Sequence, residues 1–106
     1  MAIYQCYLPI VFLGEKYCRD IAHALKSIHS EMTGTPESFV EFRFAELSPL
    51  WVLSAGDPSL YSIVNVFMKH DGHPDRRLQL KSEITAAFCR IVAIPPQNLI
   101  LGLLEI

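Results

Sequence analysis

Three of the four histidines have the residue type and spacing for acid–base chemistry. His29 follows Leu25 by four residues beside an apolar stripe, and His70 and His73 lie three residues apart in a polar segment. The pKa of imidazole lies near neutrality, so a histidine can donate or accept a proton at physiological pH. If the fold brings the three side chains around one pocket, they could catalyse an isomerisation or bind a metal. The His-x-x-His spacing is a weak metal signal, so we expect neither metal nor cofactor.

An amine and three cationic side chains could take part in the same chemistry. An initiator methionine before a small residue is normally removed, so Ala2 could present a primary α-amine that acts as a base or forms an imine. Lys69, Arg76 and Arg77 lie close to two of the histidines in sequence and could bind a negatively charged substrate. Trp51 is expected to form a wall of the substrate pocket or an interface.

Each catalytic candidate also has a structural interpretation. Ala2 can simply begin a strand, and His29 can be stabilised by the negative end of a helix dipole. His70 and His73 flank Asp71-Gly72, a dipeptide typical of solvated turns. The residues alone leave both interpretations open.

Two amphipathic helices are expected to position these side chains. Apolar residues recur at intervals of three and four in segments 15–32 and 74–93, which predicts a helix in each. Thr33-Gly34 would end the first helix, and Pro74 suits the first turn of the second. Apolar runs predict strands before and after each helix, in the order β-α-β-β-α-β. The predicted strands are 3–8, 39–44, 61–68 and 99–104, and a short hairpin is expected around Trp51 in 47–60.

The two halves of the chain repeat each other. The offset that carries Pro36 to Pro95 also carries Val40 to Leu99 and Glu46 to Glu105. The element order alone would also fit a ferredoxin-like domain, but a repeated β-α-β unit favours one four-stranded sheet with two helices on one face. We therefore expect an α/β (α+β) fold. The two glutamates are interpreted as structural or interface residues.

Composition restricts the class of protein. The 106 residues fit one domain, 1–106, and 51% of them are hydrophobic with a mean hydropathy of +0.28. A chain this small buries a limited share of its surface, so we expect partner subunits to cover some apolar residues. The net charge is −2 without a basic run, which argues against binding of nucleic acid or a membrane surface. Three widely spaced cysteines and no membrane-spanning run predict reduced thiols in a cytoplasmic protein.

Several segments resemble the tautomerase superfamily, and most of all the group typified by cis-3-chloroacrylic acid dehalogenase. The start of the chain is similar to the opening strand of that group, and His70-Asp71-Gly72-His73 falls at its second strand-to-helix turn. The junction between the first helix and the second strand resembles the group most specifically. It contains Ile28-His29-Ser30-Glu31-Met32-Thr33-Gly34-Thr35-Pro36 and Phe42-Arg43-Phe44-Ala45-Glu46.

The resemblance implies a homotrimer with pockets near subunit boundaries and an N-terminal proline as base, acid or nucleophile. Ala2 occupies the place of that proline, and His29 matches a pocket histidine that binds and polarises the substrate. His70 and His73 replace two arginines that hold a substrate carboxylate. Gly102 stands where the group has an aromatic residue on the last strand.

The general-acid carboxylate of the dehalogenases would lie beyond Ile106, so we do not expect dehalogenation. The resemblance instead implies an isomerase or lyase that acts on a small carbonyl or enol compound without the proline. His29 would polarise the substrate or shuttle protons, assisted by His70 or His73. The alternative is a non-catalytic trimer that binds a ligand or has a structural role.

Overall fold

The computed structural model describes residues 1–47, 61–70 and 73–106, which form four strands and two long helices. The elements follow the predicted order, and their ends lie within two residues of the predicted ends. The hairpin expected around Trp51 lies outside the described residues. The strands are β1 (Ala2–Leu8), β2 (Val40–Glu46), β3 (Ser62–Met68) and β4 (Leu99–Glu105); the long helices are α1 (Glu15–Thr33) and α2 (Pro74–Val92); short 3₁₀ turns are η1 (Ile10–Phe12), η2 (Glu37–Phe39) and η5 (Pro96–Asn98).

The ends of both helices follow from their terminal residues. Pro74 begins α2 because its missing N–H is not needed in the first turn. Gly34 ends α1 in the left-handed conformation with a φ of 77°, which glycine adopts without a steric penalty. Ala93 ends α2 in the same way with a φ of 56°, although it carries a Cβ.

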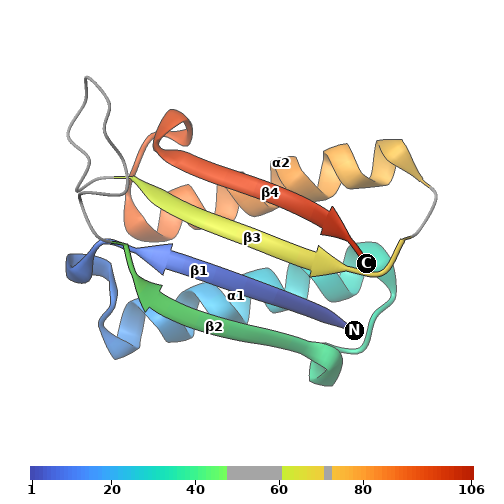
Figure 1. Ribbon diagram of the computed structural model, residues 1–106, viewed down its shortest axis with the longest axis horizontal. Coiled ribbons are helices and arrows are strands. Elements are labelled where there is room, and N and C mark those ends of the chain that lie inside the picture. Colours follow the sequence, from blue (N-terminus) through green and yellow to red (C-terminus); the bar gives the residue numbers. More distant parts are fainter. Residues whose placement is uncertain (48–60, 71–72) are drawn as a thin grey trace.

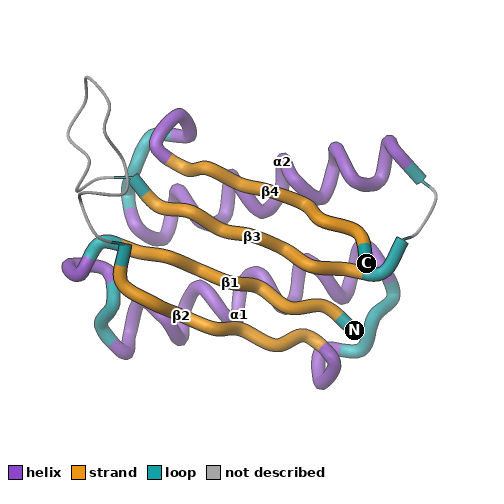
Figure 2. The backbone as a smooth tube through the Cα atoms, viewed as in Figure 1, coloured by secondary structure: helices purple, strands orange, loops and turns teal. Residues whose placement is uncertain are grey.

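The sheet has the strand order β2-β1-β3-β4 (Figure 1). Each half contributes a parallel pair, β1 with β2 and β3 with β4, and the halves meet where β1 runs antiparallel to β3. The beginning of β1 and the ends of β3 and β4 therefore lie at the same end of the sheet, where Figure 1 marks both termini. Both helices lie on one face of the sheet (Figure 2).

The core lies between the helices and this face. Alternate residues of β1 and β3 are buried, as expected for strands with one covered face. The helices contribute Ile21 and Leu25 from α1 and Leu80, Ile84 and Phe88 from α2. The predicted helical stripes are thus the buried ones.

The opposite face of the sheet carries no helix. Cross-strand pairing arranges its side chains in rows. One row joins Ile3, Phe67 and Leu104; a second joins Gln5, Asn65 and Gly102; a third joins Tyr7, Ile63 and Ile100. In a single chain Ile100 and Leu104 of β4 remain exposed on this face. We call this surface the open face.

The internal repeat extends to the three-dimensional elements. The offset that carries the start of α1 to the start of α2 also carries η2 to η5 and β2 to β4. Gly34 and Ala93 are counterparts under this offset, as are His29 and Phe88. The repeat is therefore a property of the fold as well as of the residue pattern.

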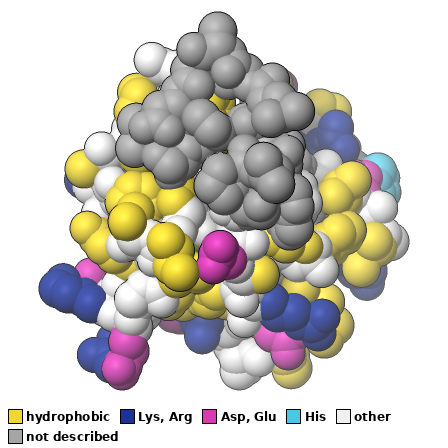
Figure 3. All heavy atoms as spheres, turned by 60° about the vertical axis from the view of Figure 1, so that its left-hand side comes forward, with side chains coloured by type: hydrophobic (Ala, Val, Ile, Leu, Met, Phe, Trp, Pro, Cys, Tyr) yellow, Lys and Arg dark blue, Asp and Glu magenta, His cyan; other side chains and the backbone are white. Residues whose placement is uncertain are grey.

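The two long helices do not resemble membrane spans. Among the described residues, no helix combines the length and apolarity needed to cross a bilayer. Hydrophobic and charged side chains alternate across the side shown in Figure 3, in keeping with the interspersed charges of the sequence.

Candidate functional site

Two neighbouring cavities lie at the end of the sheet that carries both termini. We call the first the His29 cavity; its volume is about 140 Å³. We call the second the Glu105 cavity; its volume is about 240 Å³. His70 lines both, so the cavities adjoin at this side chain. The His29 cavity is lined by Met1, His29, Thr33, Thr35, Met68, Lys69 and His70, and the Glu105 cavity by His70, His73, Pro74, Arg77 and Glu105.

The last turn of α1 holds His29 against β1. Only 1% of the His29 surface is exposed, and its Nδ1 lies 2.7 Å from the hydroxyl oxygen of Tyr4. The Thr33 hydroxyl donates a hydrogen bond to the carbonyl oxygen of His29 at 2.7 Å, which fixes the backbone of the same turn. The ring is thus held by both its side-chain and its main-chain contacts.

Aromatic packing fixes the other partner of this hydrogen bond. Tyr4 stacks on Phe42 with a centroid distance of 4.6 Å and meets His29 edge to face at 5.5 Å. Phe42 in turn stacks near Phe44 on the same strand. Such contacts restrict ring rotation, so the hydroxyl of Tyr4 is aimed at one nitrogen of His29.

His29 is neutral at physiological pH. Burial, and to a lesser extent the positive charge of the Met1 amine, lowers its pKa to about 4. Burial raises the pKa of Tyr4, so this phenol keeps its proton. Among the described residues, His29 Nδ1 is the hydrogen-bond partner of the enclosed hydroxyl. A buried O–H needs an acceptor, so Tyr4 donates to Nδ1 and the His29 proton resides on Nε2.

The Nε2 atom of His29 is the one that can meet a ligand. Tyr4 occupies Nδ1 and the His29 ring lines this cavity, so Nε2 is the ring nitrogen left for a ligand there. A neutral imidazole in this tautomer offers an N–H donor to a carbonyl or enolate oxygen.

A second side-chain cluster occupies the Glu105 cavity. Glu105, the last residue of β4, binds His70 Nδ1 through one carboxylate oxygen and Arg77 through the other. The hydrogen bond from His70 is the main reason that the pKa of Glu105 lies below its usual range, and Arg77 adds to the effect. Glu105 is therefore ionised, and Arg77 already has an internal carboxylate partner.

The structure brings some predicted site residues together and separates others. His29 and His70 share one cavity, whereas His73 lines the neighbouring one. Ala2 is buried in β1, opposite Val40 and Met68, beside the cavity wall formed by Met1. Arg77 meets Glu105, Arg76 is not among the residues that line either cavity, and Trp51 lies outside the described residues.

The sequence did not identify three residues as part of the site or gave them a lesser role in it. Tyr4 reads as an ordinary strand residue, and nothing in its spacing pairs it with His29. Glu105 was interpreted as structural; parallel pairing of β3 with β4 places its carboxylate opposite Met68 and next to His70. Lys69 was expected only as one of three cations that could bind a negatively charged substrate, and it lines the His29 cavity.

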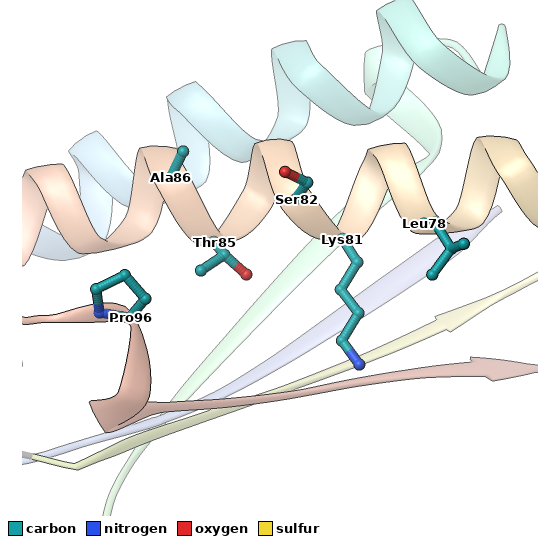
Figure 4. A pocket seen from close by; sticks show the side chains of 6 residues that line it. All are labelled: Leu78, Lys81, Ser82, Thr85, Ala86 and Pro96. Carbon is teal, nitrogen blue, oxygen red and sulfur yellow. The ribbon is translucent and has the colours of Figure 1, made fainter.

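Two larger hollows lie elsewhere on the described part of the chain and contain no histidine. A groove of about 440 Å³ runs along α2, where Lys81, Ser82 and Thr85 are its polar lining residues (Figure 4). Another, of about 500 Å³, lies between α1 and β2. Within the described part of the chain, no group of three or more His, Cys, Asp or Glu residues is arranged to hold a metal ion.

Comparison with known proteins identifies the fold. No protein-family model and no curated protein sequence matches the chain. Among solved structures, N1, a member of the cis-3-chloroacrylic acid dehalogenase family, superimposes with a TM-score of 0.89 at 17% identity over 98% of this chain and 74% of that protein. MIF2 of Leishmania major gives 0.83 at 21% identity over 100% and 89%. A fused 4-OT wild-type symmetric trimer gives 0.81 at 16% identity over 98% and 85%.

These neighbours belong to the tautomerase superfamily, and the chain has their fold. The resemblance seen in the sequence is thereby confirmed at the level of the fold. At these identities the comparison shows the fold alone, so the activity must be argued from the side chains.

Proposed function

We propose that the chain is an isomerase or lyase of the tautomerase fold that performs acid–base chemistry on a small carbonyl or enol compound without an N-terminal proline. The observation that carries the proposal is that the buried, neutral His29 lines the same cavity as His70. Keto–enol conversion needs a donor for the oxygen and a group that moves a proton at carbon. Two histidines in one cavity can divide these two tasks.

The internal repeat supports a role for His29 beyond packing. Its counterpart in α2 is Phe88, and the residue of β3 that corresponds in position to Tyr4 is Val64; both are fully buried. The same place in the fold is therefore filled by apolar groups in the second half. A buried polar pair contributes less to stability than apolar packing of similar shape. This contrast favours function as the reason for the His29–Tyr4 pair.

The cavity suits the anionic end of a small substrate. At about 140 Å³ it has the volume of a few water molecules, each of which takes about 30 Å³ in the liquid. Thr33 and Thr35 contribute hydroxyl groups, and Lys69 contributes a positive charge. An enolate, or a carboxylate on the same small molecule, matches these donors.

The test is the conversion of the enol of phenylpyruvate to its keto form, which is monitored through the loss of enol absorbance. We expect the wild type to accelerate this reaction, and we expect His29→Ala to lower kcat by about 100-fold, as for loss of one oxyanion donor. His23→Ala is the matched control because His23 is exposed on the same helix. Equal rates for the wild type, His29→Ala and buffer alone would contradict the proposal.

A non-catalytic, ligand-binding relative is the second candidate. It is favoured by the pairing of Arg77 with Glu105, which leaves this arginine already neutralised, and by the absence of a proline at position 2. In that case phenylpyruvate would shift the NMR signals of His29 and His70 without any turnover. The two candidates are separated by the same pair of measurements.

We propose further that the chain is a single-domain cytoplasmic protein that assembles into a homotrimer through the open face. Apolar residues on both sides of the Gln5–Asn65–Gly102 row support an interface on this face. The similar fused 4-OT structure is itself described as a symmetric trimer. The three cysteines are free, in keeping with a reducing compartment.

A further inference from the structure

Glu105 determines which nitrogen of His70 carries the proton. An ionised carboxylate has no proton to donate and can only accept hydrogen bonds. Because Glu105 binds His70 at Nδ1, this nitrogen must be the protonated one in the neutral ring. The Nε2 atom then has a free lone pair, and it is the nitrogen left to meet a ligand in the cavities that His70 lines.

The cluster is built in a way that orients the imidazole. Glu105 is held at the end of β4 by pairing with Met68 of β3, and the Ile106 N–H donates to the Met68 carbonyl at 2.9 Å. The Arg77 guanidinium, one turn into α2, binds the second oxygen of the same carboxylate. The Glu105 side chain is 19% exposed, while that of His70 is 70% exposed and accessible to a ligand.

We propose that His70 is the catalytic general base of this site and that Glu105, held by Arg77, is its positioning residue. This inference rests on the proposed function and assigns different tasks to the two histidines. His29, protonated at Nε2, is the hydrogen-bond donor to the substrate oxygen. In this proposal Arg77 holds Glu105, in place of the substrate-binding role expected from the sequence.

The proton transfer balances without a further reagent. His70 Nε2 takes a proton from the carbon next to the carbonyl, and the electron pair of the C–H bond becomes the new C=C bond. The π electrons of the carbonyl move to its oxygen, which accepts a hydrogen bond from His29 Nε2–H. Return of the proton from His70 to this oxygen gives the enol and restores the starting state of both histidines.

The matched variants are Glu105→Gln and Glu46→Gln. Glutamine keeps the size of the side chain and removes the charge. Glu46 is the repeat counterpart of Glu105 at the end of β2, at the opposite end of the sheet, and is exposed. We expect Glu105→Gln to lower kcat for phenylpyruvate ketonisation at least about tenfold with KM within about twofold. We expect Glu46→Gln to retain wild-type values of both.

The pH profile of kcat gives a readout that a purely structural role would not move. The titratable and charged residues that line the two cavities with His70 are Glu105 from β4, Arg77 from α2, His73 directly before α2, His29 from α1, Met1 and Lys69. We expect the kcat profile of Glu105→Gln to be displaced from that of the wild type, because Glu105 contacts the proposed base directly, and the profile of Glu46→Gln to match the wild type.

Nitrogen-15 NMR of the histidine rings tests the arrangement without any substrate. We expect neutral His70 to carry its proton on Nδ1 in the wild type and in Glu46→Gln, and to shift toward the Nε2–H tautomer in Glu105→Gln. A wild-type His70 with its proton on Nε2, unchanged in Glu105→Gln, would overturn the positioning role even if the enzyme is active. Activity that survives His70→Gln at the wild-type rate would overturn the catalytic role. A wild type that does not turn over phenylpyruvate contradicts the proposed function, while the NMR result still decides whether Glu105 orients His70.

Discussion

At the scale of single residues, the environments of His29 and His70 differ strongly although both line one cavity. His29 is enclosed beside Tyr4 and stays neutral, whereas His70 is exposed and bound to a carboxylate. Two identical side chains thereby acquire opposite properties, a fixed donor and a proton acceptor. The difference in solvation and partners also makes His29 a measurable source of pH-dependent stability.

The free energy of unfolding should decrease as the pH is lowered, because His29 resists protonation in the folded state. Its pKa is about 4 in the folded state, against 6.5 when exposed, so the unfolded chain binds the proton first as the pH falls. Between pH 7 and pH 4 this costs up to about 3 kcal/mol of unfolding free energy. We expect His29→Phe to remove this part of the loss, measured by urea unfolding at both pH values.

The matched control for this titration is His23→Phe, on the exposed side of the same helix. It should show the full wild-type loss, since its imidazole gains no buried environment on folding. A loss in His29→Phe as large as in the wild type would show that His29 is not held neutral.

At the scale of elements, much of the fold followed from the residue pattern, whereas the contacts of the site did not. The stripe through Ile21 and Leu25 identified the buried face of α1, and the repeat indicated the arrangement of the strands. The Tyr4–His29 bond joins residues 25 positions apart, and Glu105 meets His70 across 35. Periodicity describes which face is buried, but it does not identify partners across a sheet.

The two helix ends provide an internal test of backbone strain. Gly34 and Ala93 are repeat counterparts in the left-handed region, where a Cβ costs about 1–2 kcal/mol. We expect Ala93→Gly to raise the free energy of unfolding by about 1 kcal/mol, because relief of strain exceeds the entropy cost of glycine. Gly34→Ala should lower it by a similar amount, since no atom of another described residue beyond its chain neighbours lies within 4 Å of an added Cβ and only the backbone opposes the change.

Urea unfolding of the two single variants and of the double variant measures these changes in the free energy of unfolding. The double variant should lie close to the wild type because the two sites are separate and their effects add. A destabilised Ala93→Gly would show that the left-handed conformation of α2 is not strained.

At the scale of the whole molecule, the open face is the largest consequence of having helices on one side only. Two apolar rows cross strands β1, β3 and β4 on this face. They consist of Ile3, Phe67 and Leu104 and of Tyr7, Ile63 and Ile100. A surface of this kind is typical of an interface between subunits. Assembly over this face would also set how the two cavities are closed.

A charge in the middle of one apolar row of this face should dissociate the assembly. Phe67 lies between Ile3 and Leu104, so Phe67→Asp would bury an unpaired carboxylate in the interface. We expect light scattering to give a trimer mass for the wild type and a monomer mass for the variant. Leu78→Asp, at an exposed position on α2, is the control and should remain trimeric. A monomeric wild type would contradict the assembly.

The unequal halves of the repeat also determine how many ligands each chain accepts. One end of the sheet carries His29, Tyr4, His70 and Glu105. At the other end, Phe88 and Val64 take the places of His29 and Tyr4 in the core, and the apolar turn η1 lies next to the end of β2. A binding isotherm should therefore saturate at one equivalent of ligand per chain, although the backbone offers two equivalent positions. Because only one end of the sheet carries these polar side chains, substitutions at the other end should leave ligand binding unchanged.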